Sequence, residues 1–263
     1  MEKIEMDFIC VIPAREGSTR LPGKLLEDLW GEPVVFHVIC SCAKSYAQKV
    51  FLATDSEKIK ERIEASISRT KKLSQYQKDK ISIRIVKSKS VKTGTDRVAH
   101  LIRILEEEGQ KVPEIVVNVQ GDEPLISPEI INKVVKVLSD DTQASISTYG
   151  FLSKDPHEFR NPNRVKIVVS QNGDAIYFSR SPIPYGAKNF IIHTGIYAFR
   201  KDKLLKFLSL PQSKNEVLEK LEQLRAIDNG MKIKVLVGKK KLFPVDTEKD
   251  LKFLRNLKKF KRG

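Results

Sequence analysis

Hydrophobic residues along the chain alternate between short apolar runs and longer segments in which they recur every three or four positions. The runs Asp7–Ile12, Lys49–Thr54 and Ile115–Val119 have the length and β-branched content of buried strands. Segments with the periodicity of amphipathic helices are Leu25–Ser45, Ser56–Lys80, Arg97–Glu108, Asn215–Gly230 and Glu248–Leu257. Strands that alternate with helices predict an α/β fold with a mostly parallel, Rossmann-like sheet covered by helices.

The pattern changes between Arg160 and Arg180, where β-branched residues alternate on both sides of the turn Gln171–Asp174. Such alternation around a glycine-containing turn is the signal of a β-hairpin. We therefore expect a smaller β-rich mixed lobe at about residues 155–200, embedded in a single domain that comprises residues 1–263.

The composition adds a strong positive charge to this picture. Lys and Arg number 48 against 33 Asp and Glu, which gives a formal net charge of +15. The cations are scattered, and no RNA-binding aromatic signature or recognition helix accompanies them. A basic protein also attracts nucleotide triphosphates and acidic sugars. Small acidic substrates are therefore favoured over nucleic acid, although a basic RNA-binding protein stays open as an alternative.

Hydropathy and cysteine content bear on the compartment. No apolar run approaches the roughly 20 residues of a membrane span, and the N-terminus does not resemble a signal peptide. Cys10, Cys40 and Cys42 are an odd number without a C-x-x-C spacing, which favours buried free thiols. The expectation is a cytoplasmic protein with no membrane partner.

The segment Val11–Lys24, VIPAREGSTRLPGK, joins the first predicted strand to the first predicted helix. Arg15, Arg20 and Lys24 lie in it together with two glycines, and cations with close backbone approach suit an oligophosphate. Neither the mononucleotide P-loop pattern nor the dinucleotide G-x-G-x-x-G pattern is present. As loop cations, these side chains are expected to be exposed and to contribute little to folding. An ordinary solvated loop is the alternative.

Polar residues follow the apolar strands directly. Asp122 comes just after Ile115–Val119, and a carboxylate at the end of a central parallel strand can hold a hard cation against phosphates. Ser127 and Pro128 supply a separate start for the next helix, which leaves Asp122 available. Lys92–Arg97, KTGTDR, predicts a turn with Thr95 or Asp96 as the N-cap of the following helix.

Taken together, these motifs resemble those of the 3-deoxy-manno-octulosonate cytidylyltransferase (CMP-KDO synthetase) family. The matching segments are VIPAREGSTRLPGK, KTGTDR, NVQGDEP, NPNRVK, AIYFSR, HTGIY, EQLR and VDTEKDL. The resemblance implies a nucleotidyltransferase that moves CMP from CTP to 3-deoxy-D-manno-octulosonic acid (KDO), for lipopolysaccharide synthesis. The wording LEKLEQLRA leans towards the branch that acts on the 8-amino analogue. A cytidylyltransferase for another sugar acid, such as a sialic acid, is the alternative within this class.

The resemblance also assigns residues to roles, along with Mg²⁺ as cofactor and a homodimer as the assembly. The implied catalytic residues are Arg15, Arg20, Lys24 and Asp122. The implied nucleotide-binding residues are Ala14, Arg15, Thr19, Arg20, Lys24, Gly94, Thr95 and Gln120. The implied sugar-binding residues are Gln120, Arg180, His193, Tyr197, Glu222 and Gln223. The implied metal ligands are Asp122 and Asp246, which only a closed fold can bring together.

Overall fold

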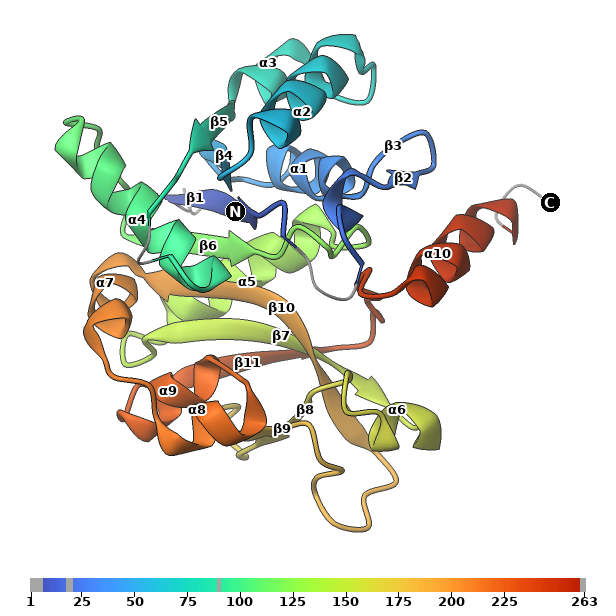
Figure 1. Ribbon diagram of the computed structural model, residues 1–263. Coiled ribbons are helices and arrows are strands. Elements are labelled where there is room, and N and C mark those ends of the chain that lie inside the picture. Colours follow the sequence, from blue (N-terminus) through green and yellow to red (C-terminus); the bar gives the residue numbers. More distant parts are fainter. Residues whose placement is uncertain (1–6, 18–20, 89–90, 261–263) are drawn as a thin grey trace, which may run out of the picture. The chain divides into compact units, whose positions relative to one another are not determined.

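The computed structural model describes residues 7–17, 21–88 and 91–260 and divides into two compact units (Figure 1). Unit 1 comprises residues 1–131 and 242–263, and unit 2 comprises residues 132–241. The β-rich block expected at about residues 155–200 lies inside unit 2. The grouping of both units into a single domain stays a prediction.

A parallel sheet forms the centre of unit 1, with strand order β6, β1, β4, β5. Its strands are β1 (Phe8–Ala14), β4 (Lys49–Thr54), β5 (Ile81–Ile85) and β6 (Ile115–Val119). Every residue of β1 and β6 is buried, as expected for central strands that are covered on both faces. The carboxyl ends of these two strands therefore open side by side at one edge of the sheet.

The helices of unit 1 follow its strands in alternation. They are α1 (Val34–Lys44), α2 (Glu57–Arg69), α3 (Gln75–Asp79), α4 (Gly94–Glu107) and α10 (Glu248–Phe260), with a short 3-10 turn η1 (Lys24–Leu26) and a ribbon of β2 (Asp28–Leu29) and β3 (Glu32–Pro33). Helix α5 (Pro128–Asp140) begins at the expected Pro128 and carries the chain from unit 1 into unit 2.

The expected continuous helix from residue 25 to residue 45 is wrong. Trp30 and Gly31 both have positive φ, 59° and 88°, and this left-handed turn joins β2 to β3. Pro33 then precedes α1, whose first residue is Val34. A left-handed pair and a proline both interrupt helical hydrogen bonding, so only the second half of the periodic segment is helical.

Two other helix boundaries differ from the sequence expectation. Residue Thr93, rather than Thr95 or Asp96, is the N-cap of α4: its hydroxyl accepts from the Asp96 amide, and the Asp96 carboxylate accepts from the Thr93 amide. This capping box needs three-residue spacing, which only Thr93 and Asp96 provide. The segment from 56 to 80 is likewise two helices, because α2 ends before Thr70 and α3 starts after a new capping box at Ser74.

The C-terminal helix α10 completes the core of unit 1. Its Leu251 and Leu254 are fully buried with Leu29 and Val34. The indole of Trp30 donates a hydrogen bond to the Leu254 carbonyl at 3.1 Å. This packing fixes the residues just before α10, among them Asp246.

Unit 2 is built around a mixed sheet. Its strands are β7 (Ile146–Ser153), β8 (Lys166–Val169), β9 (Ala175–Ser179), β10 (Phe190–Arg200) and β11 (Ile233–Gly238). Strand β10 runs antiparallel to β7 and β8, β9 forms the predicted hairpin with β8, and β11 runs parallel to β7. The remaining helices of unit 2 are α6 (Pro156–Arg160), α7 (Lys201–Ser209), α8 (Lys214–Glu219) and α9 (Gln223–Asp228). A helix-covered parallel sheet with a β-rich mixed part confirms the predicted fold class.

The single helix expected at residues 215–230 is divided into α8 and α9. Lys220 has φ 54° and ψ 47°, a left-handed conformation that ends α8. A buried ion pair stabilises the corner: Arg225 donates to both carboxylate oxygens of Glu216, at 2.8 and 2.5 Å. The Arg225 guanidinium also lies over the Phe207 ring, 4.7 Å from its centroid.

Loss of this pair is expected to destabilise the fold. Arg225→Met leaves the buried Glu216 carboxylate without its partner, which costs about 3–5 kcal/mol in the free energy of unfolding. The double variant Glu216→Gln/Arg225→Met removes the stranded charge and should recover part of that loss. Urea denaturation of the three proteins tests this, and a loss below about 1 kcal/mol for Arg225→Met would contradict the assignment.

Candidate active site

The first part of the site is the loop after β1. Ala14 is buried at the strand end, and Arg15, Glu16 and Gly17 are exposed. The amide of Glu16 donates to Asp55 Oδ1 at 3.3 Å. Arg15 is thus placed, as expected, on an exposed loop at the carboxyl end of a central strand. Two further predicted residues of this loop, Thr19 and Arg20, lie outside the described residues.

Asp55 is in turn held by an arginine from the KTGTDR segment. Arg97 donates to Asp55 Oδ2 at 2.7 Å and to the Val86 carbonyl at 2.5 Å, and its side chain is only 7% exposed. A continuous set of bonds therefore links helix α4 through Asp55 to the backbone at Glu16. Sequence reasoning missed Arg97, although a charged residue on the apolar face of a predicted helix was a usable signal.

The second part of the site is an ion triad at Lys24. Gly23, with φ 70°, turns the chain into η1, and the Lys24 ammonium then donates to Asp122 Oδ2 at 2.5 Å and to Asp246 Oδ1 at 3.0 Å. Asp122 follows β6, and Asp246 precedes α10. The backbone joins the same two segments, because the Val245 amide donates to the Asp122 carbonyl at 2.8 Å. The expected convergence of the two carboxylates is confirmed.

The triad is largely shielded from solvent. The side chains of Lys24, Asp122 and Asp246 are 13%, 21% and 19% exposed. Burial alone would lower the pKa of Lys24, but the charges and hydrogen bonds of Asp122 and Asp246 outweigh it and raise that pKa above its ordinary value. The expectation that Lys24 is an exposed loop cation is therefore wrong.

The Asp246 carboxylate is not needed as a helix cap. Thr247 and Asp250 form the reciprocal pair at the start of α10: the Asp250 amide donates to the Thr247 hydroxyl, and the Thr247 amide donates to the Asp250 carboxylate. The capping alternative for Asp246 thus loses its basis. Its side chain is available for the cation that it contacts.

The turn at Gly94 lies against the end of β1. A Cβ on Gly94 would stand 3.2 Å from Pro13 Cγ and 3.4 Å from Gln120 Nε2, so a larger residue would crowd both. Thr95 is buried, and its hydroxyl accepts a bond from Asn118 at 3.2 Å. Gly94, Thr95 and Gln120 are thereby brought together within unit 1, while their contact with a nucleotide stays a prediction. Asn118, a polar residue inside the most apolar strand, signalled this bonding and was overlooked.

The residues predicted to bind a sugar, other than Gln120, all lie in unit 2. Arg180 is held by main-chain carbonyls: Nε donates to Glu219, and the two terminal nitrogens donate to Pro162 and Lys220. Three of its five N–H groups are used in these bonds, so two are left for a carboxylate. The geometry is compatible with the predicted bidentate pairing.

His193 and Tyr197 are neighbours on β10, with ring centroids 5.2 Å apart. Burial, followed by the negative charge of Glu222, raises the pKa of Tyr197. Glu222 and the buried Gln223 stand at the start of α9, directly after the Lys220 turn. The structure therefore gathers His193, Tyr197 and Glu222 in one region of unit 2.

Hydrogen bonding fixes the tautomer of His193. The Thr148 hydroxyl donates to the Ile196 carbonyl at 2.7 Å, so its oxygen must accept from His193 Nε2, 3.2 Å away. The neutral ring then carries its proton on Nε2 and offers Nδ1 as an acceptor. Burial lowers the pKa of His193 to about 3, which favours this neutral form.

The donor set at the triad suits a small hard cation. No cluster of three or more His, Cys, Asp or Glu side chains that could hold a metal occurs in the described part of the chain. Mg²⁺, however, is commonly bound by one or two carboxylates together with waters and substrate phosphates. Asp122 and Asp246, already drawn to one positive charge, fit that requirement.

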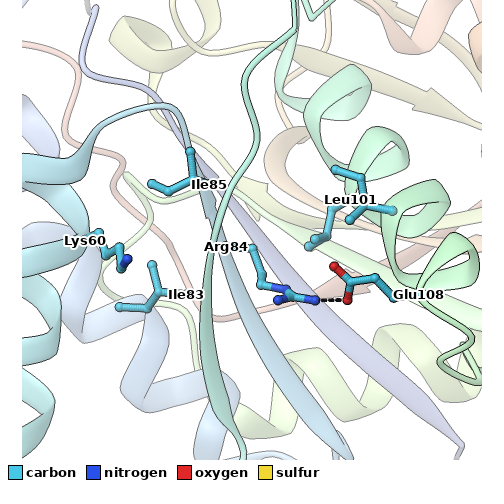
Figure 2. Close-up of a pocket in the computed structure, with 7 residues that line it drawn as sticks. Lys60, Ile83, Arg84, Ile85, Leu101 and Glu108 are labelled. Carbon is cyan, nitrogen blue, oxygen red and sulfur yellow. Dashed lines mark hydrogen bonds and ion pairs between the residues drawn. The ribbon is translucent and has the colours of Figure 1, made fainter.

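A pocket elsewhere in unit 1 contains none of the predicted site residues. Figure 2 shows it between α2, β5 and α4, with Arg84 paired to Glu108. Its volume is about 280 Å³, and Lys60, Ile83 and Leu101 also line it. Its distance in the fold from the strand ends of β1 and β6 separates it from the ion triad. Among the described helices, none is both long and apolar enough to span a membrane.

Comparison with known proteins gives one consistent family. The family described as cytidylyltransferase matches residues 9–233. The chain is 39% identical to the 3-deoxy-manno-octulosonate cytidylyltransferase of Thermodesulfovibrio yellowstonii, over 94% of this chain and 96% of that protein. It is 41% identical to the enzyme of the same name from Polynucleobacter asymbioticus, over 95% of each chain. A solved structure of CMP:2-keto-3-deoxy-manno-octonic acid synthetase complexed with CTP matches with a TM-score of 0.80 and 33% identity, over 97% of this chain and 99% of that one.

The buried, neutral His193 predicts a specific acid sensitivity. Its folded pKa of about 3 lies below the ordinary 6.5, so the unfolded chain takes up the extra proton and stability is lost as the pH falls from about 6.5 towards 3. His193→Gln should flatten that part of the stability curve, measured by urea denaturation at successive pH values. His157→Gln, a change at an exposed histidine of unit 2, is the control and should keep the slope of the parent protein. Equal slopes for the parent and His193→Gln would contradict the assignment.

Proposed function

This chain belongs to the cytidylyltransferase family, and we propose from that premise that it transfers CMP from CTP to 3-deoxy-D-manno-octulosonic acid. The products are the CMP-sugar, a precursor for lipopolysaccharide synthesis, and pyrophosphate. The observation that carries the proposal is the ion triad of Lys24, Asp122 and Asp246, which joins the phosphate-loop motif to the two predicted metal ligands. Relatives with this activity match nearly the whole length of the chain.

In the proposed reaction, the anomeric hydroxyl of the sugar attacks the α-phosphorus of CTP. The new bond joins the sugar oxygen to phosphorus, the bond from phosphorus to the bridging oxygen breaks, and pyrophosphate leaves with that electron pair. Arg15, Arg20 and Lys24 neutralise phosphate oxygens, and Gly94, Thr95 and Gln120 contact the nucleotide. Catalysis of this kind rests on positioning and charge stabilisation, so no covalent nucleophile is required.

Enzymes of this class generally use a divalent metal, and we propose Mg²⁺ held by Asp122 and Asp246. Bound there, it would neutralise phosphate charge and polarise oxygen ligands. A cation on these carboxylates competes with Lys24 for the same oxygens. The Lys24 ammonium, once released from them, is free to bond a phosphate oxygen.

The sugar is assigned to the unit 2 residues. We propose that Arg180 pairs with its carboxylate through the two N–H groups that main-chain carbonyls do not use. His193 accepts a sugar hydroxyl at Nδ1, and Tyr197, Glu222 and Gln223 make further polar contacts. A homodimer in the cytoplasm is the expected state, and the 8-amino sugar stays a predicted alternative substrate.

The deciding experiment is pyrophosphate release from CTP with a panel of sugar acids. The expected result is release with KDO and Mg²⁺, and none with CTP alone. The panel includes the 8-amino analogue and a sialic acid, so it also separates the alternatives within the class. Retention on RNA without pyrophosphate release on any sugar would favour the non-enzymatic alternative and overturn the proposal.

A second prediction tests the metal assignment without relying on turnover. Lys24→Met leaves Asp122 and Asp246 facing each other without their shared cation, so the free energy of unfolding should fall by about 1–3 kcal/mol. Millimolar Mg²⁺ should restore stability in Lys24→Met far more than it stabilises the parent, because a ligand that binds only the folded state raises the melting temperature. Activity should fall by about two to three orders of magnitude, the scale of losing one charge-stabilising donor.

The control for this prediction is Lys24→Met/Asp246→Asn, which removes both the repulsion and one ligand. Its melting temperature should respond little to Mg²⁺. Equal responses of the single and double variants would show that the two carboxylates do not share a cation.

A further inference from the structure

Lys166 is a fully buried lysine in unit 2 whose side chain ends among main-chain carbonyls. It is the first residue of β8, paired with Ser179 of β9 and Ile192 of β10, and none of its surface is exposed. Its ammonium donates to the carbonyls of Asn161 at 3.1 Å, Arg164 at 2.7 Å and Arg180 at 2.6 Å. An ammonium has three N–H groups, so all of them are used.

The same carbonyl-rich region is held from a second side by Arg180. Its guanidinium donates to the Pro162 carbonyl at 3.0 Å and to the Glu219 carbonyl at 2.8 Å. The Glu219 carboxylate accepts from the Arg180 amide at 2.8 Å. Residue 180 is thus fixed by its carbonyl, its amide and its side chain at once.

The electrostatic cost of Lys166 is real. Burial lowers its pKa to about 8, the negative charge of Glu219 opposes that shift, and the positive charge of Arg180 adds to it. Three carbonyl acceptors offset part of the cost, because they bond the charged form. Removing the ammonium would leave those carbonyls buried without a donor, which is itself unfavourable.

These contacts exclude two other roles for Lys166. Its ammonium is enclosed, so it cannot touch a sugar or a nucleotide directly. Its three N–H groups are committed to carbonyls, so it is not presented as a nucleophile either. What its bonds do reach is the backbone of Arg180, and of the residues before β8 that Arg180 also contacts.

We propose that Lys166 is a positioning residue of the sugar site, which locks the backbone at residue 180 so that the two unused N–H groups of Arg180 meet the carboxylate of the acidic sugar. The inference deepens the proposed function and rests on it. Precise placement matters here because a bidentate guanidinium–carboxylate pair tolerates little displacement.

The main experiment compares Lys166→Met with the parent enzyme. The change keeps the length of the side chain and removes all three donors. The KM for the sugar should rise about ten- to hundredfold, while the KM for CTP and kcat should stay within about threefold. Lys154→Met, a change at an exposed lysine of the same unit, is the matched control and should leave all three constants unchanged.

A double-variant cycle shows whether Lys166 acts through Arg180. In the background of Arg180→Ala, the further change Lys166→Met should add little to the KM for the sugar, because the group that it positions is already gone. Fully additive effects would overturn the proposal. So would an equal rise in the KM for both substrates.

Hydrogen exchange separates this inference from the proposed function. In Lys166→Met, faster amide exchange should be confined to residues 161–166 and 179–182, whether or not the protein turns over KDO. Unchanged exchange there would sink the positioning role even if the enzyme is active on KDO. Faster exchange there, with no activity of the parent on any sugar, would instead count against the proposed function alone.

If Lys166→Met does not fold, the parent enzyme still provides a test. Raising the pH from about 7 to about 9.5 discharges an ammonium whose pKa is about 8, while Arg180 and Glu219, the charged groups that face it, keep their charges. The KM for the sugar should then rise more steeply than the KM for CTP. Parallel profiles for the two substrates would overturn the proposal.

Discussion

One ammonium group bonded to two carboxylates organises the nucleotide half of this protein. Lys24 comes from the loop after β1, Asp122 from the end of β6, and Asp246 from the segment before α10. Each lies on an element with its own reason to be there: a glycine turn, a central parallel strand, and a helix whose leucines complete a core. If any of the three elements shifted, the charges would no longer meet, and a partly buried ion would be left without its partner.

Unit 2 solves a different electrostatic problem, the satisfaction of main-chain carbonyls. Lys166 and Arg180 together bond carbonyls at Asn161, Pro162, Arg164 and Glu219, in a region without a regular ladder. Cations are well suited to this task because they donate several bonds and accept none. The consequence is a stiff segment that still keeps two guanidinium N–H groups for a ligand. Unit 1 uses opposite charges to hold its site, whereas unit 2 uses charge against neutral dipoles.

The sequence was informative where one local rule decided the outcome. Apolar runs predicted β1, β4 and β6 within a residue or two, and Pro128 predicted the start of α5. It failed where a residue adopted an uncommon backbone conformation. The left-handed Trp30 and Lys220 divided two periodic segments that otherwise look like continuous helices. Neither residue type signals positive φ, so only packing around it could reveal the break.

For the candidate site, motifs identified Lys24, Asp122 and Asp246, but not how they are bonded to one another. The burial of Lys24 depends on α10, which folds against β2 and β3 from more than two hundred residues away. Arg97, Asn118 and Lys166 were missed for a related reason. Their partners are backbone carbonyls and side chains distant in sequence, and no spacing rule reports such contacts.

Because unit 1 is assembled from the first 131 residues and the last 22, its folding follows an order that synthesis imposes. The strands of the parallel sheet leave the ribosome early, with Lys24 and Asp122 among them. Leu251, Leu254 and Asp246 arrive only when translation is nearly over. A growing chain therefore carries an open core and a lysine with a single carboxylate until its last residues emerge. The charge arrangement that we associate with catalysis thus also marks the completion of the chain.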